Sequence, residues 1–263
     1  MPEVKEHAPG SFCWIELGTN DASAAKKFYS ELFGWSFVDN PMGPDEFYTI
    51  FKIRGLDVAA MYTLREDQTS QGVPPHWMTY VSVASADDAA KKAASIGGKV
   101  VADAFDVMDA GRMAILQDPL GATLCAWQAK ANTGIGLTGE TGTLCWDELW
   151  TTDHKKAADF YTGLFGWVAK DSSADAPGGY TEWVNGGQSI GGMMEITPEM
   201  GPVPPNWLPY FIVEDCDATA DKVKSLGGKL QVPPMDIAHV GRFSVTQDPQ
   251  GATFAIVKFS TPA

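Results

Sequence analysis

Basic residues are scarce in this sequence. The 263 residues include 19 Lys and Arg against 33 Asp and Glu, a formal net charge of −14. Nucleic-acid binding needs a basic surface, so this charge argues against it. No apolar run approaches the roughly 20 residues of a membrane-spanning helix, and the N-terminal segment lacks the apolar stretch of a secretory signal. We therefore expect a soluble, cytoplasmic protein that binds neither nucleic acid nor membrane.

Cysteine is also scarce, and its spacing argues against several kinds of site. The four cysteines, Cys13, Cys125, Cys145 and Cys216, form no C-x-x-C pair, so neither a zinc knuckle nor a disulfide framework is predicted. Each Gly-Gly pair follows an expected helix and does not precede one, so no phosphate-binding loop is expected. The hydrophobic fraction of 44% is that of an ordinary globular chain.

The sequence consists of two similar halves. Residues 13–17 (CWIEL) return as residues 145–149 (CWDEL), a shift of 132 residues. Residues 117–123 (QDPLGAT) return as residues 247–253 (QDPQGAT), a shift of 130 residues. The two residues are lost between Leu64 and Pro74, and a length change tolerated there indicates a surface loop. We predict two homologous domains, residues 8–130 and 143–260, joined by a linker, residues 131–142.

Each half contains a fainter repeat of its own. Two helical segments, around Ala24-Ala25-Lys26-Lys27 and Ala89-Ala90-Lys91-Lys92, each end at glycine, the usual C-terminal stop of a helix. Runs rich in aromatic and β-branched residues predict the surrounding strands, at residues 12–17, 47–53, 58–63, 77–83, 112–117 and 123–128. The expected fold class is α+β: four βαβββ modules that pair into two cup-shaped, antiparallel-rich sheets, with helices on one face.

These motifs resemble the vicinal oxygen chelate superfamily, the family of glyoxalases, extradiol dioxygenases and bleomycin-binding proteins. The resemblance rests on Phe-Tyr-x-x-Leu-Phe-Gly-Trp at one helix end, Gly-Gly after the other helix, and Asp-Pro-x-Gly before the last strand. It covers the whole chain, twice over. The tandem arrangement is similar to actinobacterial proteins described as hydroxylase-like or as glyoxalase-type antigens. The resemblance implies that each pair of modules forms a cup that holds a small molecule.

The metal ligands of that superfamily are missing from the matching positions. Counted from the shared motifs, these positions hold Trp14, Met78, Cys125 and either Ala60 or Met61 in the first half, and Trp146, Leu208, Ala255 and either Gly192 or Met193 in the second. Histidine or glutamate would be needed there to hold a divalent ion. We therefore expect no metal and no other cofactor, and glyoxalase or dioxygenase chemistry is disfavoured.

Strand alternation predicts which residues line the cups. Residues two apart share a face, so the first cup contains Trp14, Glu16, Met78, Tyr80, Cys125 and Trp127, and the second contains Trp146, Glu148, Trp150, Leu208, Tyr210 and Ala255. Mostly apolar walls with a few polar groups are typical of small-molecule pockets. The alternative is that these aromatic side chains only fill the core of the sheet. Met61, Met193, His239 and Arg242 complete the predicted ligand-binding set.

Glu16 and Glu148 are the candidate catalytic residues. A carboxyl group on a cup-facing strand would be desolvated, with a raised pKa, and could act as a general acid or base. Arg112 and Arg242 could pair with these carboxylates, although a structural ion pair elsewhere is the more common role. The sequence favours a binding protein for a small apolar or aromatic ligand. A metal-independent hydroxylase-, isomerase- or lyase-like enzyme is the alternative, followed by a glyoxalase or dioxygenase with an atypical metal site. The chain could be a monomer or a homodimer.

Overall fold

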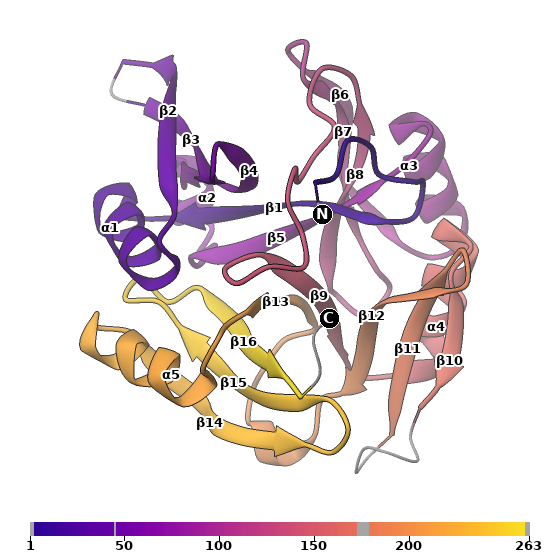
Figure 1. The fold of residues 1–263 in the computed structure, drawn as a ribbon. Coiled ribbons are helices and arrows are strands. Elements are labelled where there is room, and N and C mark those ends of the chain that lie inside the picture. The colour runs from indigo at the N-terminus through magenta and orange to yellow at the C-terminus, as the bar shows by residue number, and fades with distance from the viewer. Residues whose placement is uncertain (1–2, 45, 173–178, 261–263) are drawn as a thin grey trace.

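The computed structural model describes residues 3–44, 46–172 and 179–260, which form two eight-stranded sheets packed back to back (Figure 1). The elements of the first half are β1 (Phe12–Thr19), α1 (Ala22–Phe33), β2 (Ser36–Gly43), β3 (Glu46–Ile53), β4 (Leu56–Thr63), α2 (Glu66–Ser70), β5 (His76–Ser82), α3 (Ala86–Ser95), β6 (Lys99–Val107), β7 (Gly111–Gln117) and β8 (Thr123–Ala129). Those of the second are β9 (Leu144–Thr151), α4 (His154–Phe165), β10 (Val168–Asp171), β11 (Tyr180–Asn185), β12 (Gln188–Glu195), η2 (Pro198–Met200), β13 (Asn206–Ile212), α5 (Cys216–Ser225), β14 (Lys229–Ile237), β15 (Gly241–Gln247) and β16 (Thr253–Phe259).

The two sheets have the same topology. Their strand orders are β2-β3-β4-β1-β5-β8-β7-β6 and β10-β11-β12-β9-β13-β16-β15-β14. The central pair of each sheet, β1–β5 or β9–β13, is antiparallel, and each central strand has a parallel neighbour on its other side. The predicted α+β fold of four βαβββ modules is therefore confirmed. In Figure 1 the arms of the first sheet rise from the centre and those of the second descend, so the two cups open on opposite sides.

Local sequence explains the helix boundaries. The Asp21 side chain accepts a hydrogen bond from the Ala24 amide and caps α1, and Gly34 ends the helix in the left-handed conformation at φ 73°. The edge strands β2 and β6 were not among the predicted runs because they are largely exposed, and Pro41 lies within β2. Such edge strands carry a weaker apolar signal than strands of the buried centre.

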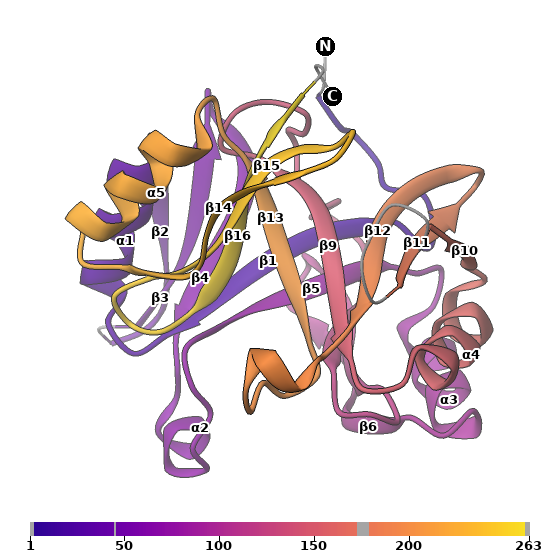
Figure 2. The same ribbon diagram turned by 90° about the horizontal axis from the view of Figure 1, so that it is seen from below.

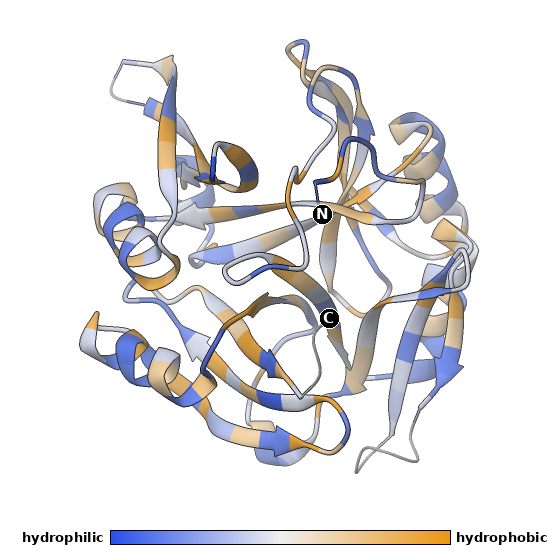
Figure 3. Cartoon of the chain, in the orientation of Figure 1, coloured by the Kyte–Doolittle hydropathy of each residue, from blue (hydrophilic) through white to orange (hydrophobic). Residues whose placement is uncertain are grey.

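The helices and the outer faces of the sheets form the core between the two halves. Helix α1 lies beside α5, and α3 lies beside α4 (Figures 1 and 2). Figure 3 shows polar and apolar residues interspersed along α1 and α5, as in amphipathic helices. None of the helices in the described ranges is long and apolar enough to cross a membrane.

Two equivalent tyrosines bridge the halves. The Tyr29 hydroxyl donates to Asp248 Oδ2 at 3.0 Å, and the Tyr161 hydroxyl donates to Asp118 Oδ2 at 3.1 Å. Oδ1 of each aspartate accepts three backbone N–H groups of its own Asp-Pro-x-Gly turn. The turn motif is thus a joint between the halves as well as a chain reversal.

The segment between the halves also packs against the first sheet. The Ile135 amide donates to the Cys13 carbonyl at 2.7 Å, and the Gly136 amide donates to the Asp57 carbonyl at 2.8 Å. Leu137 is fully buried. Residues 131–142 therefore form a fixed connection in the described structure.

Candidate ligand-binding cups

Strand register places the two glutamates on the inner faces of the sheets. Glu16 lies opposite Met78 on β5 and Ala60 on β4. Glu148 lies opposite Leu208 and Gly192 in the same way. The helices lie on the other face, so both carboxyl groups point into the cups.

In the second cup, both carboxylate oxygens of Glu148 accept hydrogen bonds. Oε1 accepts from the Tyr210 hydroxyl and from the Trp150 indole N–H, each at 2.8 Å, and Oε2 accepts from the Tyr180 hydroxyl at 2.9 Å. The side chain is buried, at 5% exposure. Burial raises the pKa of Glu148, and the three hydrogen bonds partly oppose that rise. The carboxyl group is therefore held in one position.

In the first cup, Glu16 has fewer donors and more contact with solvent. Oε1 accepts from the Tyr80 hydroxyl at 3.1 Å. Burial raises the pKa of Glu16, and hydrogen bonding from Tyr48 and Tyr80 opposes the rise. The side chain is nevertheless partly exposed. It can therefore present hydrogen-bonding capacity to a molecule in the cup.

Most of the predicted lining residues share these inner faces. Tyr80 lies beside Trp14 on β1 and Cys125 on β8, and its ring meets that of Trp127 edge to face, with centroids 6.2 Å apart. The second cup has Trp146, Trp150 and Tyr210 around Glu148. Burial raises the pKa of the Cys125 thiol well above its usual value, so the thiol is unreactive.

Register decides between the alternatives left open on β4 and β12. Ala60 and Gly192 lie opposite the glutamates, so Met61 and Met193, one residue on, belong to the outer faces. Met61 is fully buried there.

Arg242 and His239 lie away from the second glutamate. Arg242 donates to Asp217 on α5 and to Asp236, and Arg112 pairs with Asp87 and Asp106 in the same manner. The possible pairing of these arginines with Glu16 and Glu148 is wrong, because Arg112 and Arg242 extend toward the helices on the outer faces. The alternative, a structural ion pair, is what the structure contains. His239 is exposed in the β14–β15 turn.

Tyr48 and Tyr180 were missed by sequence reasoning. The Trp14 indole donates to the Tyr48 hydroxyl at 3.2 Å, and the Trp146 indole donates to the Tyr180 hydroxyl at 3.0 Å. The two tyrosines are 132 residues apart and therefore equivalent, which is the signal that could have revealed them. A Cβ at Gly192 would lie only 1.9 Å from the Tyr180 hydroxyl, so glycine is what lets this tyrosine reach Glu148.

The donor set does not fit the divalent ion of metal-dependent glyoxalases and dioxygenases. The described residues contain no cluster of three or more His, Cys, Asp or Glu side chains that could hold a metal. Each cup instead has a single carboxyl group surrounded by phenols and indoles. The cups, as the described residues form them, therefore do not supply the ligands that such an ion needs.

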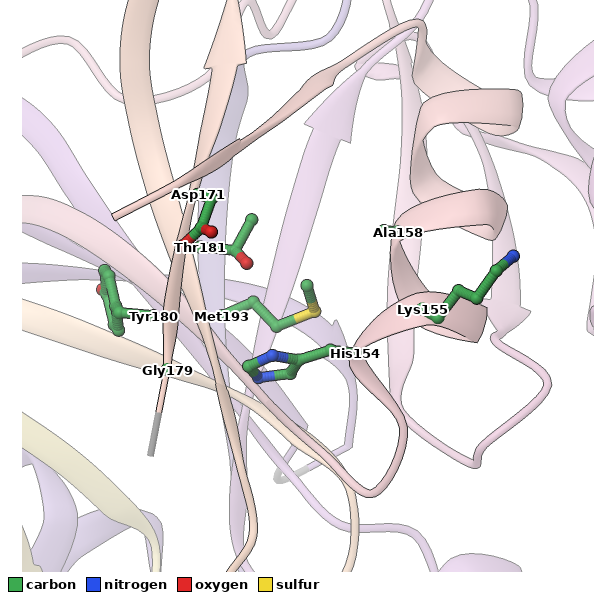
Figure 4. A pocket seen from close by; sticks show the side chains of 8 residues that line it. All are labelled: His154, Lys155, Ala158, Asp171, Gly179, Tyr180, Thr181 and Met193. Atoms are coloured by element: carbon green, nitrogen blue, oxygen red, sulfur yellow. The ribbon is translucent and has the colours of Figure 1, made fainter. Parts of the chain in front are cut away.

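A separate cavity of about 380 Å³ lies on the outer side of the second sheet, between α4 and strands β11 and β12. In Figure 4 the Met193 sulfur lies near the His154 ring, while Tyr180 points away from both toward the cup. A second depression follows the β14–β15 turn and includes His239 and Arg242. Both hollows are distinct from the glutamate clusters.

Comparison with known proteins agrees with this architecture. The model of the Glyoxalase/Bleomycin resistance protein/Dioxygenase superfamily matches residues 11–126 and 143–256. The chain belongs to this superfamily. Among solved structures, the 2,3-dioxygenase LapB from Pseudomonas sp. KL28 has a TM-score of 0.66 at 11% identity, covering 97% of this chain and 95% of that one. A Mn(II)-bound glyoxalase from Novosphingobium aromaticivorans has a TM-score of 0.63 at 16% identity, covering 97% and 86%. These two likenesses concern the fold.

Two curated members of the superfamily resemble the chain along nearly its whole length. CFP32 of Mycobacterium tuberculosis, named as a candidate glyoxylase, is 42% identical over 259 residues, with 98% of both chains covered. The anthracycline biosynthesis protein DnrV of Streptomyces peucetius is 34% identical over 265 residues, with 95% of this chain and 94% of that one covered. Both relatives therefore share the tandem arrangement.

Proposed function

We propose that this superfamily member binds a flat, apolar aromatic molecule in a cup, without a metal ion. The observation that carries the proposal is a buried carboxyl group hydrogen-bonded by phenols at the floor of an aromatic-walled cup. Aromatic walls contribute buried area and stacking, and one polar group fixes the orientation of the ligand. The name of DnrV, which refers to anthracycline biosynthesis, supports a flat aromatic ligand class.

The test is calorimetric titration of the purified chain with 2-naphthol, a small flat phenol, before and after treatment with EDTA. We expect saturable binding that chelation leaves unchanged, with the naphthol recovered intact. Absence of saturable binding, or its loss on chelation, would overturn the proposal. Anisole, a smaller ring without a hydroxyl donor, is the matched control and should bind more weakly.

A second candidate function is proton transfer by Glu16, in a metal-independent enzyme of the isomerase or lyase type. The observation that favours it is that Glu16 is partly exposed while burial raises its pKa, a combination suited to a general base. The superfamily relative CFP32, whose name refers to a glyoxylase, supports an enzymatic role. In deuterium oxide, the chain should accelerate exchange of the α-protons of 2-tetralone, and Glu16→Gln should abolish the acceleration. An exchange rate equal to that in buffer would contradict this candidate.

A further inference from the structure

The two cups differ at the position next to their glutamates. Gly18 and Trp150 occupy equivalent positions, two residues after Glu16 and Glu148. The Trp150 indole N–H donates to Glu148 Oε1 at 2.8 Å, and the Trp150 side chain is 6% exposed. The second cup thus contains an aromatic ring with a hydrogen-bond donor, supplied by the chain itself and seated on its carboxylate.

The first cup has no side chain at that position. A Cβ added to Gly18 would lie 3.1 Å from the Tyr62 hydroxyl and 3.2 Å from His76 Cε1. Glu16 therefore lacks the indole donor that Glu148 has, and its side chain remains partly exposed. A carboxylate has room for about four hydrogen bonds, so Glu16 can accept another donor. The Tyr62 hydroxyl, where the second cup has Met194, adds a polar group beside the same spot.

The outer walls differ in the same direction. On the inner face of the first sheet, Val38 pairs with Ile50, and Val38 is 47% exposed. The equivalent pair in the second sheet is Lys170 and Glu182, which form a salt bridge at 3.1 Å. Ser172 and Ser189 also donate to Glu182. The first cup therefore has an apolar approach to its carboxylate, and the second has a charged one.

We infer that the first cup is the ligand site, and that its ligand is a flat aromatic molecule whose hydroxyl or N–H group donates to Glu16, as the Trp150 indole does to Glu148. This inference rests on the proposed binding function and adds which cup binds and what the ligand must carry. The second cup is occupied by its own Trp150 and has the structural role.

Paired glutamine variants test the inference. With 2-naphthol at slightly alkaline pH, Glu16→Gln should weaken binding about tenfold, because it replaces a charged acceptor with a neutral one. Glu148→Gln should leave the affinity unchanged. With 2-methoxynaphthalene, which has the ring but no donor, Glu16→Gln should have little effect. Weakening by Glu148→Gln alone, or equal weakening of both probes, would overturn the inference while leaving the binding function intact. Failure of the wild type to bind either probe would instead overturn the proposed function.

A second pair of variants avoids the buried carboxyl groups and guards against misfolding. Val38→Lys gives the first wall the charge of the second and should weaken 2-naphthol binding several-fold, since the lysine must be desolvated or displaced by an apolar ligand. Lys170→Val is the matched control and should leave the affinity unchanged. Both positions are exposed, and melting curves verify that both variants fold. The reverse pattern, with Lys170→Val alone altering affinity, would place the ligand in the second cup.

Discussion

The two cups share a scaffold and differ in what completes the environment of the glutamate. Both have a glutamate on the first strand, a tyrosine on each neighbouring module and a tryptophan two residues before the glutamate. In the second cup Trp150 completes the hydrogen bonding of Glu148, whereas in the first cup Gly18 stands at that position. Duplication can therefore preserve a fold while one copy satisfies its polar group internally and the other leaves it available.

The largest effect is expected from removing the internal aromatic ring. Trp150→Ala should lower the free energy of unfolding by about 3–5 kcal/mol, because it deletes a buried ring and a donor to Glu148. Free indole should restore part of the melting temperature by entering the gap. Urea denaturation with and without indole is the measurement.

The matched variant in the first half is Gly18→Ala. Its Cβ would meet only side-chain atoms, 3.0–3.2 Å away, so we expect a loss of about 1 kcal/mol and no response to indole. A similar indole response in both variants would contradict the contrast between the cups.

A second difference between the halves lies at their interface. Asp147 Oδ1 accepts a hydrogen bond from Thr79 at 2.5 Å, and the side chain is 1% exposed. Its equivalent in the first half is Ile15. Burial raises the pKa of Asp147 from 3.8 to about 7. The folded protein therefore holds this proton more tightly than the unfolded chain does, and the stabilisation is lost as pH rises from about 4 through about 7.

Asp147→Asn should remove that pH dependence. At pH above about 7 we expect the variant to be more stable than the wild type by on the order of 3 kcal/mol, because no charge must then be buried at the interface. Below about pH 4 the difference should vanish. Urea unfolding of both proteins across this range is the measurement, and a stability difference that does not change with pH would contradict the account.

The bridging tyrosines test whether the scaffold is as symmetric as it looks. Tyr161→Phe removes a donor to Asp118 and an acceptor for the Trp207 indole, and Tyr29→Phe does the same to Asp248 and Trp77. Each should cost about 2 kcal/mol. Thermal denaturation that gave clearly unequal losses would show that the two halves are joined differently.

The sequence was sufficient for the fold because repeats and turn motifs are local signals. Its two shifts identified the halves, and strand alternation placed Glu16, Tyr80 and Glu148 on inner faces. The partners of the glutamates were harder to foresee, since Tyr48 and Tyr180 reach them only through strand pairing. Met61 and Ala60 differ by one residue, so only the register could show that Ala60 shares the cup face. The partners of Arg242 depend on how α5 packs, which no local pattern reveals.

A crystal structure of the chain with bound 2-naphthol tests the central claim most directly. The account predicts one naphthol in the first cup, with its hydroxyl within hydrogen-bond distance of Glu16, and an unchanged Trp150–Glu148 contact in the second. Naphthol beside Glu148, with the Trp150 ring displaced and the first cup empty, would contradict it.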